Sequence, residues 1–151
     1  MPGLYFDDFT VGRHFAHEVT RTITEADNIW FSCLTLNPQP LHIDAHAAAR
    51  SEYGRPIVNS LFTLGLLVGL TVADTTLNTT VANLGFTEVK FPAPVFPGDS
   101  IRAETWVREV RPSRSRPVQG IVTFEHKAFN QDGVEVASCL RAALMRCRPA
   151  A

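Results

Sequence analysis

One segment, residues 61–74, restricts the possible folds more than any other part of the chain. If the segment is a helix, apolar side chains cover nearly every face of it: Leu61, Phe62, Leu64, Leu66, Leu67, Val68, Leu70 and Val72. Asn59 or Ser60 can cap its start. A helix with so little polar surface is expected to be buried on all sides, so the rest of the chain must wrap around it. The apolar stretch is too short to cross a bilayer.

The second half of the sequence predicts four long strands, at residues 81–91, 101–111, 119–130 and 134–148. The last two are joined through Asp132-Gly133, a strong hairpin signal. Long consecutive strands favour antiparallel pairing. With a further strand at 18–23, we expect an α+β fold in which a sheet of about five antiparallel strands wraps around the apolar helix.

The first half predicts two more helices. Thr24 can cap a helix that runs to about Leu34, with Asp27 as its capping-box partner, and this helix is expected to bury Ile29, Trp30 or Cys33. A second helix is expected from its cap at Asp44 to Tyr53, with Gly54 as the stop. Residues 55–58 should then be extended because of Pro56.

Length and composition indicate one domain, residues 1–151, of a globular protein. The formal net charge is -1, which favours neither nucleic acid nor an anionic membrane as a partner. Residues 1–10 lack the basic and apolar regions of a signal peptide. Three widely separated cysteines, Cys33, Cys139 and Cys147, form no CxxC pair, so we expect reduced thiols in a cytoplasmic protein.

Residues 37–44, Asn-Pro-Gln-Pro-Leu-His-Ile-Asp, are the strongest candidate for a functional site. Two prolines exclude regular helix and hold the polar side chains in a rigid turn. His42 can gain and lose a proton near neutral pH, which suits general acid–base catalysis, although it could instead only bond the turn. His42 and His46 are four apart, but a helix that starts at Asp44 separates them, so no metal site is predicted.

The sequence around these residues resembles that of the MaoC-like dehydratases, which include the (R)-specific enoyl-CoA hydratases. The resemblance rests on three segments in order, 37–42, 56–61 and 91–99, and extends over roughly 6–145. It implies the hotdog fold and a hydratase or dehydratase, a carbon–oxygen lyase, acting on the double bond of an α,β-unsaturated acyl-CoA. It also implies a homodimer in which the two sheets are joined edge to edge and the active sites lie at the interface. No cofactor is expected, because the CoA is part of the substrate.

Two positions depart from the family motif. Asn37 stands where the family has Asp, and Gln39 stands where it has Asn, whereas Pro40, Leu41 and His42 match. The variant looks closer to the branch that handles mesaconyl-, methylmalyl- or itaconyl-CoA.

An amide can orient water but accepts no proton usefully. Either His42 acts alone, with Asn37 and Gln39 holding the water, or a carboxylate assists. That carboxylate could be Asp44, which could orient the imidazole or simply cap a helix, or it could belong to the substrate. An inactive site is a further alternative.

Substrate contacts are expected around the start of the apolar helix. The backbone N–H of Ser60 or Leu61, fixed by Asn59, can stabilise the thioester oxygen. Gly65 and Gly69 share one helix face, where a thin ligand chain could approach. The CoA phosphates require cations, for which the sequence offers Arg114 and Arg116 in a basic loop, or Arg50 and Arg55.

Two other functions are compatible with the same fold. A thioesterase would need a carboxylate to activate water, for which Asp44 or Glu52 could serve. A non-catalytic acyl-CoA-binding subunit would be consistent with the missing acid at position 37.

Overall fold

The computed structural model describes residues 3–149. The elements in chain order are η1 (Phe6–Asp8), β1 (His14–Ala16), β2 (Arg21–Thr22), α1 (Glu25–Leu34), α2 (Pro40–Ile43), α3 (Ala45–Ala48), α4 (Ser60–Thr75), β3 (Thr80–Lys90), β4 (Ser100–Pro112), β5 (Gln119–Phe129) and β6 (Glu135–Arg146). None of the helices in this range combines the length and the apolarity needed to span a membrane.

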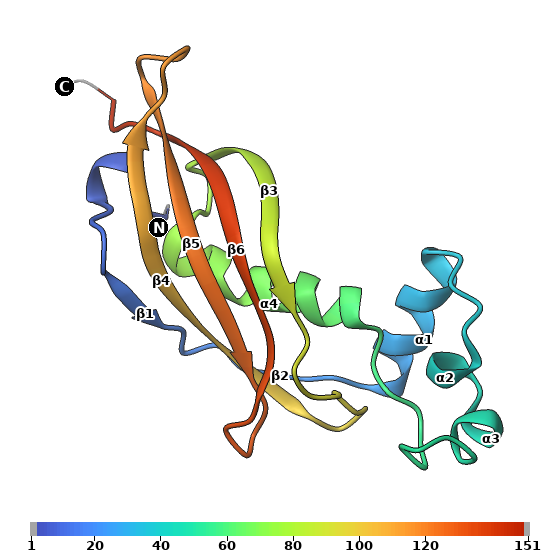
Figure 1. The fold of residues 1–151 in the computed structure, drawn as a ribbon. Coiled ribbons are helices and arrows are strands. Elements are labelled where there is room, and N and C mark those ends of the chain that lie inside the picture. Colours follow the sequence, from blue (N-terminus) through green and yellow to red (C-terminus); the bar gives the residue numbers. More distant parts are fainter. Residues whose placement is uncertain (1–2, 150–151) are drawn as a thin grey trace.

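An antiparallel sheet curves around α4, as the sequence predicted (Figure 1). The strand order is β1-β4-β5-β6-β3, and β2 adds a short pairing to β4. The four long strands lie within two residues of their predicted bounds, and β5 and β6 form the expected hairpin, in which Gly133 has φ +77°. Of the first predicted strand, at 18–23, only the two residues of β2 form a strand, and β1 lies before the predicted range; both pair with β4.

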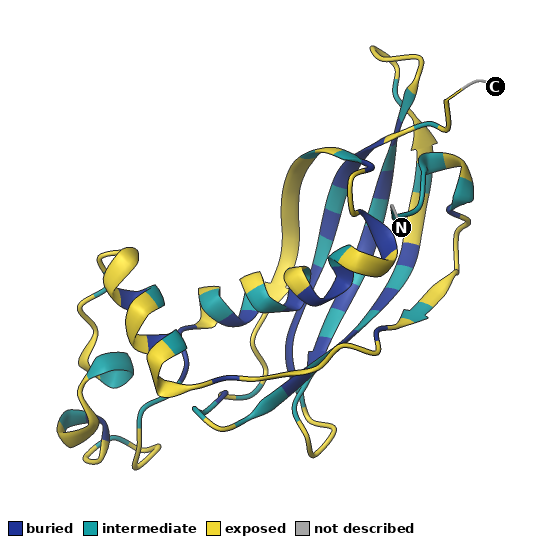
Figure 2. Cartoon of the chain, turned by 180° about the vertical axis from the view of Figure 1, so that it is seen from behind, coloured by how far each residue is buried: buried dark blue, intermediate teal, exposed yellow. Residues whose placement is uncertain are grey.

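Alternation along the strands separates a buried face from an outer one. On β5, and on β4 as far as Val107, every second residue is buried against α4 and the N-terminal segment (Figure 2). The buried positions include Val107, Val122 and Phe124, which pack with Phe9. Gly120 belongs to the same face, and a Cβ atom there would lie within about 2.5 Å of the Phe6 ring, so a larger residue would force that ring to move.

Strand β3 forms one edge of the sheet. It pairs with β6 on one side, and no strand among residues 3–149 pairs with its other side. Apolar side chains along it remain at least one-third exposed, among them Val81, Leu84 and Phe86. An exposed apolar edge of this kind is a surface that promotes association.

Helix α4 begins at its Asn59 cap. The sequence analysis had predicted that this helix is buried on all sides, and it is not. Its buried residues, Thr63, Leu67, Leu70, Thr71 and Thr75, follow one face, which rests on the sheet. Leu61 is 61% exposed, and Gly65 and Gly69 are exposed, with no atom within 4 Å of a Cβ built on either glycine. The prediction was wrong for a single chain because the sheet covers only one side of this helix.

Helix α1 begins at the predicted capping box, in which the Asp27 amide donates to Thr24 Oγ1 over 3.2 Å. However, its expected core face is wrong. Trp30 is 71% exposed, Ile29 and Cys33 are also exposed, and the buried residues are instead Asn28 and Ser32. The inward face of α1 is polar because it bonds the main chain of neighbouring segments.

Candidate functional site

The Pro-rich segment contains a single helical turn, α2, where the sequence analysis had predicted none. Pro40 occupies the first position of this turn, where the missing N–H costs nothing. Asn37 Oδ1 accepts a bond from the Gln39 amide over 3.1 Å, which fixes the approach to the turn. Pro40 therefore begins a short helix instead of preventing one, and His42 lies in its last turn.

The imidazole of half-buried His42 has one identified partner. Its Nδ1 atom lies 2.9 Å from the carbonyl oxygen of Ile57. A carbonyl can only accept, so Nδ1 must be the protonated nitrogen, and a neutral ring then has a free lone pair on Nε2. The site thus holds a histidine whose second nitrogen is ready to take a proton.

Three segments meet at a buried cluster formed by Asn28, Ser32 and Asn59, each at most 3% exposed. Asn28 Nδ2 donates to the carbonyl oxygens of His42 (2.9 Å) and Ile57 (3.0 Å). Asn28 Oδ1 accepts from the Asn59 amide at 2.8 Å. Asn59 Nδ2 donates to Ser32 Oγ at 3.3 Å. One helix face therefore joins the histidine turn to the start of α4.

The sequence analysis missed Asn28 and Ser32. They are four residues apart and share one face of α1, whereas Trp30 and Leu34, also four apart, are apolar and exposed. A helix in which the polar pair is buried and the apolar pair is exposed reverses the usual pattern. That reversal could not be recognised without knowing which face meets the rest of the molecule.

The predicted cap at the start of α4 has the expected geometry. Asn59 Oδ1 accepts from the Leu61 amide over 3.0 Å, and the Asn59 carbonyl accepts from the Thr63 amide. The Leu61 amide is therefore already occupied. Within residues 3–149, the amide of exposed Ser60 has no acceptor, so it is the better placed of the two predicted donors.

Asp44 caps α3 through a 3.0 Å bond from the Ala47 amide to its Oδ1 atom. That bond holds the pKa of the Asp44 carboxyl below its ordinary value. The sequence analysis also considered that Asp44 could orient the imidazole of His42, but the partner of His42 Nδ1 is the carbonyl of Ile57. The helix that Asp44 begins ends at Ala48, well before the predicted Tyr53.

The predicted phosphate-binding arginines lie in two separate regions. Arg114 and Arg116 belong to the loop between β4 and β5, at the opposite end of the sheet from α2 and α3 (Figure 1). The guanidinium of Arg55 lies 3.8 Å from the centre of the Phe96 ring, and the residues that follow these two, Pro56 and Pro97, line the same cavity as His42. A single chain therefore does not bring Arg114 and Arg116 to the histidine.

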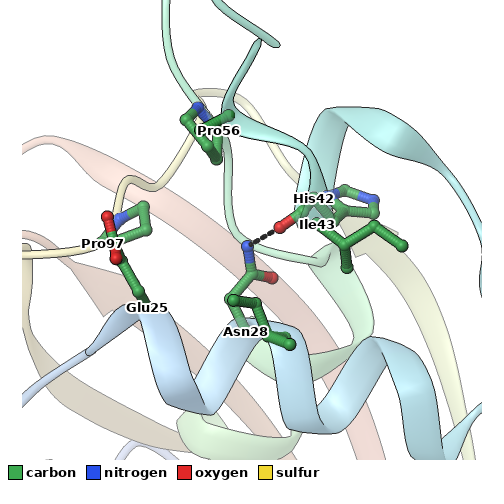
Figure 3. A pocket seen from close by; sticks show the side chains of 8 residues that line it. Glu25, Asn28, His42, Ile43, Pro56 and Pro97 are labelled. Carbon is green, nitrogen blue, oxygen red and sulfur yellow. Dashed lines mark hydrogen bonds between the residues drawn. The ribbon is translucent and has the colours of Figure 1, made fainter. Parts of the chain in front are cut away.

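A small cavity of about 60 Å³ adjoins the cluster, lined by Glu25, Asn28, Ile29, His42, Ile43, Ala45, Pro56 and Pro97. In Figure 3, Glu25 and Pro97 lie on one side of it and His42 and Ile43 on the other, with Asn28 between them. Its volume is far below the several hundred Å³ that an organic ligand of ordinary size occupies. It is therefore not large enough to hold an acyl-CoA.

Comparison with known proteins identifies relatives of this chain. The chain is 33% identical to the mesaconyl-CoA hydratase of Cereibacter sphaeroides, over 99% of this chain and 43% of that protein. It is 31% identical to the β-methylmalyl-CoA dehydratase of Chloroflexus aurantiacus, over 97% of this chain and 41% of that protein. The chain thus spans about two fifths of the length of these relatives.

The fold is that of a solved Mycobacterium tuberculosis protein described as a double hotdog, with a TM-score of 0.86 at 20% identity. The superposition covers 97% of this chain and 45% of that protein, which confirms the hotdog fold expected from the sequence. The model of the MaoC-like domain matches residues 8–129. The chain therefore belongs to the family of MaoC-like domains.

Proposed function

We propose that this chain catalyses the reversible addition of water to the double bond of an α,β-unsaturated acyl-CoA. The observation that carries the proposal is the bond from His42 Nδ1 to the Ile57 carbonyl, because a neutral ring held this way has its free lone pair on Nε2. In hydration, Nε2 takes a proton from water while the oxygen adds to the β-carbon. The same nitrogen then returns the proton to the α-carbon, so the enzyme is unchanged at the end.

Two further groups assist in this mechanism. The free amide of Ser60 donates to the thioester oxygen as negative charge develops on it. Asn37 Oδ1 is engaged by the Gln39 amide, which leaves the Asn37 NH₂ group to hold the water oxygen. In this proposal Asn37 orients the water, and His42 acts as the base.

The substrate we propose is a short, branched dicarboxylic acyl-CoA. Support comes from the names of two relatives, a mesaconyl-CoA hydratase and a β-methylmalyl-CoA dehydratase. Arg55 is an exposed cation on the side of His42 and is available to a substrate carboxylate or phosphate.

We further propose that two copies associate through β3. The free edge of β3 and its exposed apolar side chains support this assembly. The exposed face of α4, with Gly65 and Gly69, would then form a wall of the acyl site beside the second copy. A second surface is needed because the cavity at His42 is too small for the ligand.

An absorbance assay with mesaconyl-CoA, itaconyl-CoA and crotonyl-CoA tests the proposal, with a thiol reagent in parallel. We expect loss of the enoyl band without thiol release. His42→Asn should lower kcat at least about 100-fold, because Asn can still donate to Ile57 but cannot act as a base. His46→Asn, an exposed histidine four residues away, is the control. Thiol release would indicate a thioesterase instead, and the absence of both signals would indicate a binding subunit.

A further inference from the structure

The carbonyl of Ile57 accepts two hydrogen bonds, and both concern the histidine site. One comes from His42 Nδ1 at 2.9 Å and the other from Asn28 Nδ2 at 3.0 Å. A carbonyl oxygen has two lone pairs, so these bonds fill its capacity. The position of this oxygen determines which imidazole nitrogen carries the proton.

Both the NH₂ group and the oxygen of the Asn28 side chain are hydrogen-bonded. Its NH₂ group reaches the carbonyls of His42 and Ile57, and its oxygen receives the Asn59 amide. The side chain is 1% exposed, so water cannot replace these bonds. Asn28 therefore links the main chain of His42 to the carbonyl oxygen of Ile57, which the ring of His42 also bonds.

We propose that Asn28 is a positioning residue for His42 that acts through the Ile57 carbonyl. It holds that oxygen where it keeps the proton on Nδ1 and leaves Nε2 bare. Without Asn28 the carbonyl is held by fewer contacts, and the ring can exchange its proton between the two nitrogens. This inference rests on the proposed function for its kinetic consequence but not for its structural one.

Asn28→Asp is the most selective variant. The carboxylate keeps the shape of the side chain and an oxygen for the Asn59 amide, but it loses both donors. Asn28→Ser, with a single hydroxyl donor, provides a second variant if the first fails to fold. Ser32→Ala is the matched control, because Ser32 is buried in the same cluster and bonds Asn59 Nδ2 without touching Ile57.

Nitrogen NMR of His42 in the substrate-free protein is the first measurement. We expect the wild type and Ser32→Ala to show one tautomer, with Nδ1 protonated and Nε2 unprotonated at a pH where the ring is neutral. Asn28→Asp, or Asn28→Ser, should show a mixture of tautomers. An unchanged tautomer in the Asn28 variants, or the same mixture in Ser32→Ala, would overturn the proposal.

Kinetics of hydration form the second measurement. We expect kcat to fall about 10- to 100-fold in the Asn28 variants while KM changes less than threefold, because the base is misoriented and substrate contacts remain. An equal loss in Ser32→Ala would show that only general stability had changed. If the wild type hydrates no enoyl-CoA but the tautomer still responds to Asn28, the proposed function fails and the positioning role stands.

Discussion

His126 Nδ1 lies 2.8 Å from Thr105 Oγ1, deep within the curved face of the sheet. Thr105 in turn bonds His17 Nε2 at 2.8 Å, and His17 Nδ1 bonds Asp74 at 2.7 Å. Asp74 can only accept, so His17 donates to it from Nδ1, whereas the directions of the two Thr105 bonds depend on the protonation of the two imidazoles. Among the described residues, the Nε2 atom of His126 has no hydrogen-bond partner.

The buried imidazole of His126 should make the protein sensitive to acid. Burial, followed by the charges of Arg141 and His17, lowers the pKa of His126 to about 3. Between that value and the unfolded pKa of about 6.5, the unfolded chain binds the extra proton, so stability falls as the pH decreases. His126 should therefore account for a loss of up to about 4 kcal/mol between pH 7 and pH 3.

Urea unfolding of His126→Asn across this pH range measures that contribution. Asn keeps a donor for Thr105 but does not titrate. The variant should be less stable at pH 7, yet its free energy of unfolding should fall less steeply below pH 6.5. His14→Asn, at an exposed histidine, is the control. Parallel curves for the wild type and His126→Asn would contradict the expectation.

Replacing Ser60 with proline should remove the amide that we assign to the thioester oxygen. Ser60 is the first residue of α4, where proline is well tolerated, and Asn59 before it already has an extended backbone at φ -57° and ψ 125°. Ser60→Pro should fold normally and lose about 100-fold in kcat. Ser60→Ala, which keeps the N–H, should retain activity. Equal rates for the two variants would exclude this amide.

Asn37→Asp should place a carboxylate base at the position where the resemblance in the sequence implies one. An aspartate can still accept the bond from the Gln39 amide, so the turn should be preserved. We expect hydration of crotonyl-CoA to increase at least tenfold, because general bases contribute about 100-fold or more. Asn130→Asp is the matched control, since Asn130 makes the same kind of turn beyond β5. No gain, or a similar gain in the control, would argue against a base position at residue 37.

Leu84→Lys should disrupt the proposed pairing of two copies. Leu84 lies on β3 and is 51% exposed, so a charge there costs little in a single chain but opposes an apolar interface. Light scattering on a sizing column should report a dimer for the wild type and a monomer for the variant. Val19→Lys, at an exposed residue outside β3, should remain dimeric. A monomeric wild type would refute the assembly.

The sequence predicted the elements of the sheet better than those of the site. Alternation and turn residues such as Gly133 located the long strands, because these signals are local. The inward face of α1 was predicted wrongly because burial of Asn28 depends on carbonyls at residues 42 and 57, far away in the chain. The partner of His42 Nδ1 was missed for the same reason, since a main-chain carbonyl leaves no trace in the sequence.

The three bonds of Asn28 all end on main-chain atoms, at residues 42, 57 and 59. These bonds do not depend on the identity of the side chains at residues 42, 57 and 59. The side chains of residues 39 and 60 make none of these bonds, so we expect both positions to be exchangeable while the histidine and the start of α4 stay in place. For protein engineering, variants at these positions can be selected for new substrate preferences, provided that residue 28 is left unchanged.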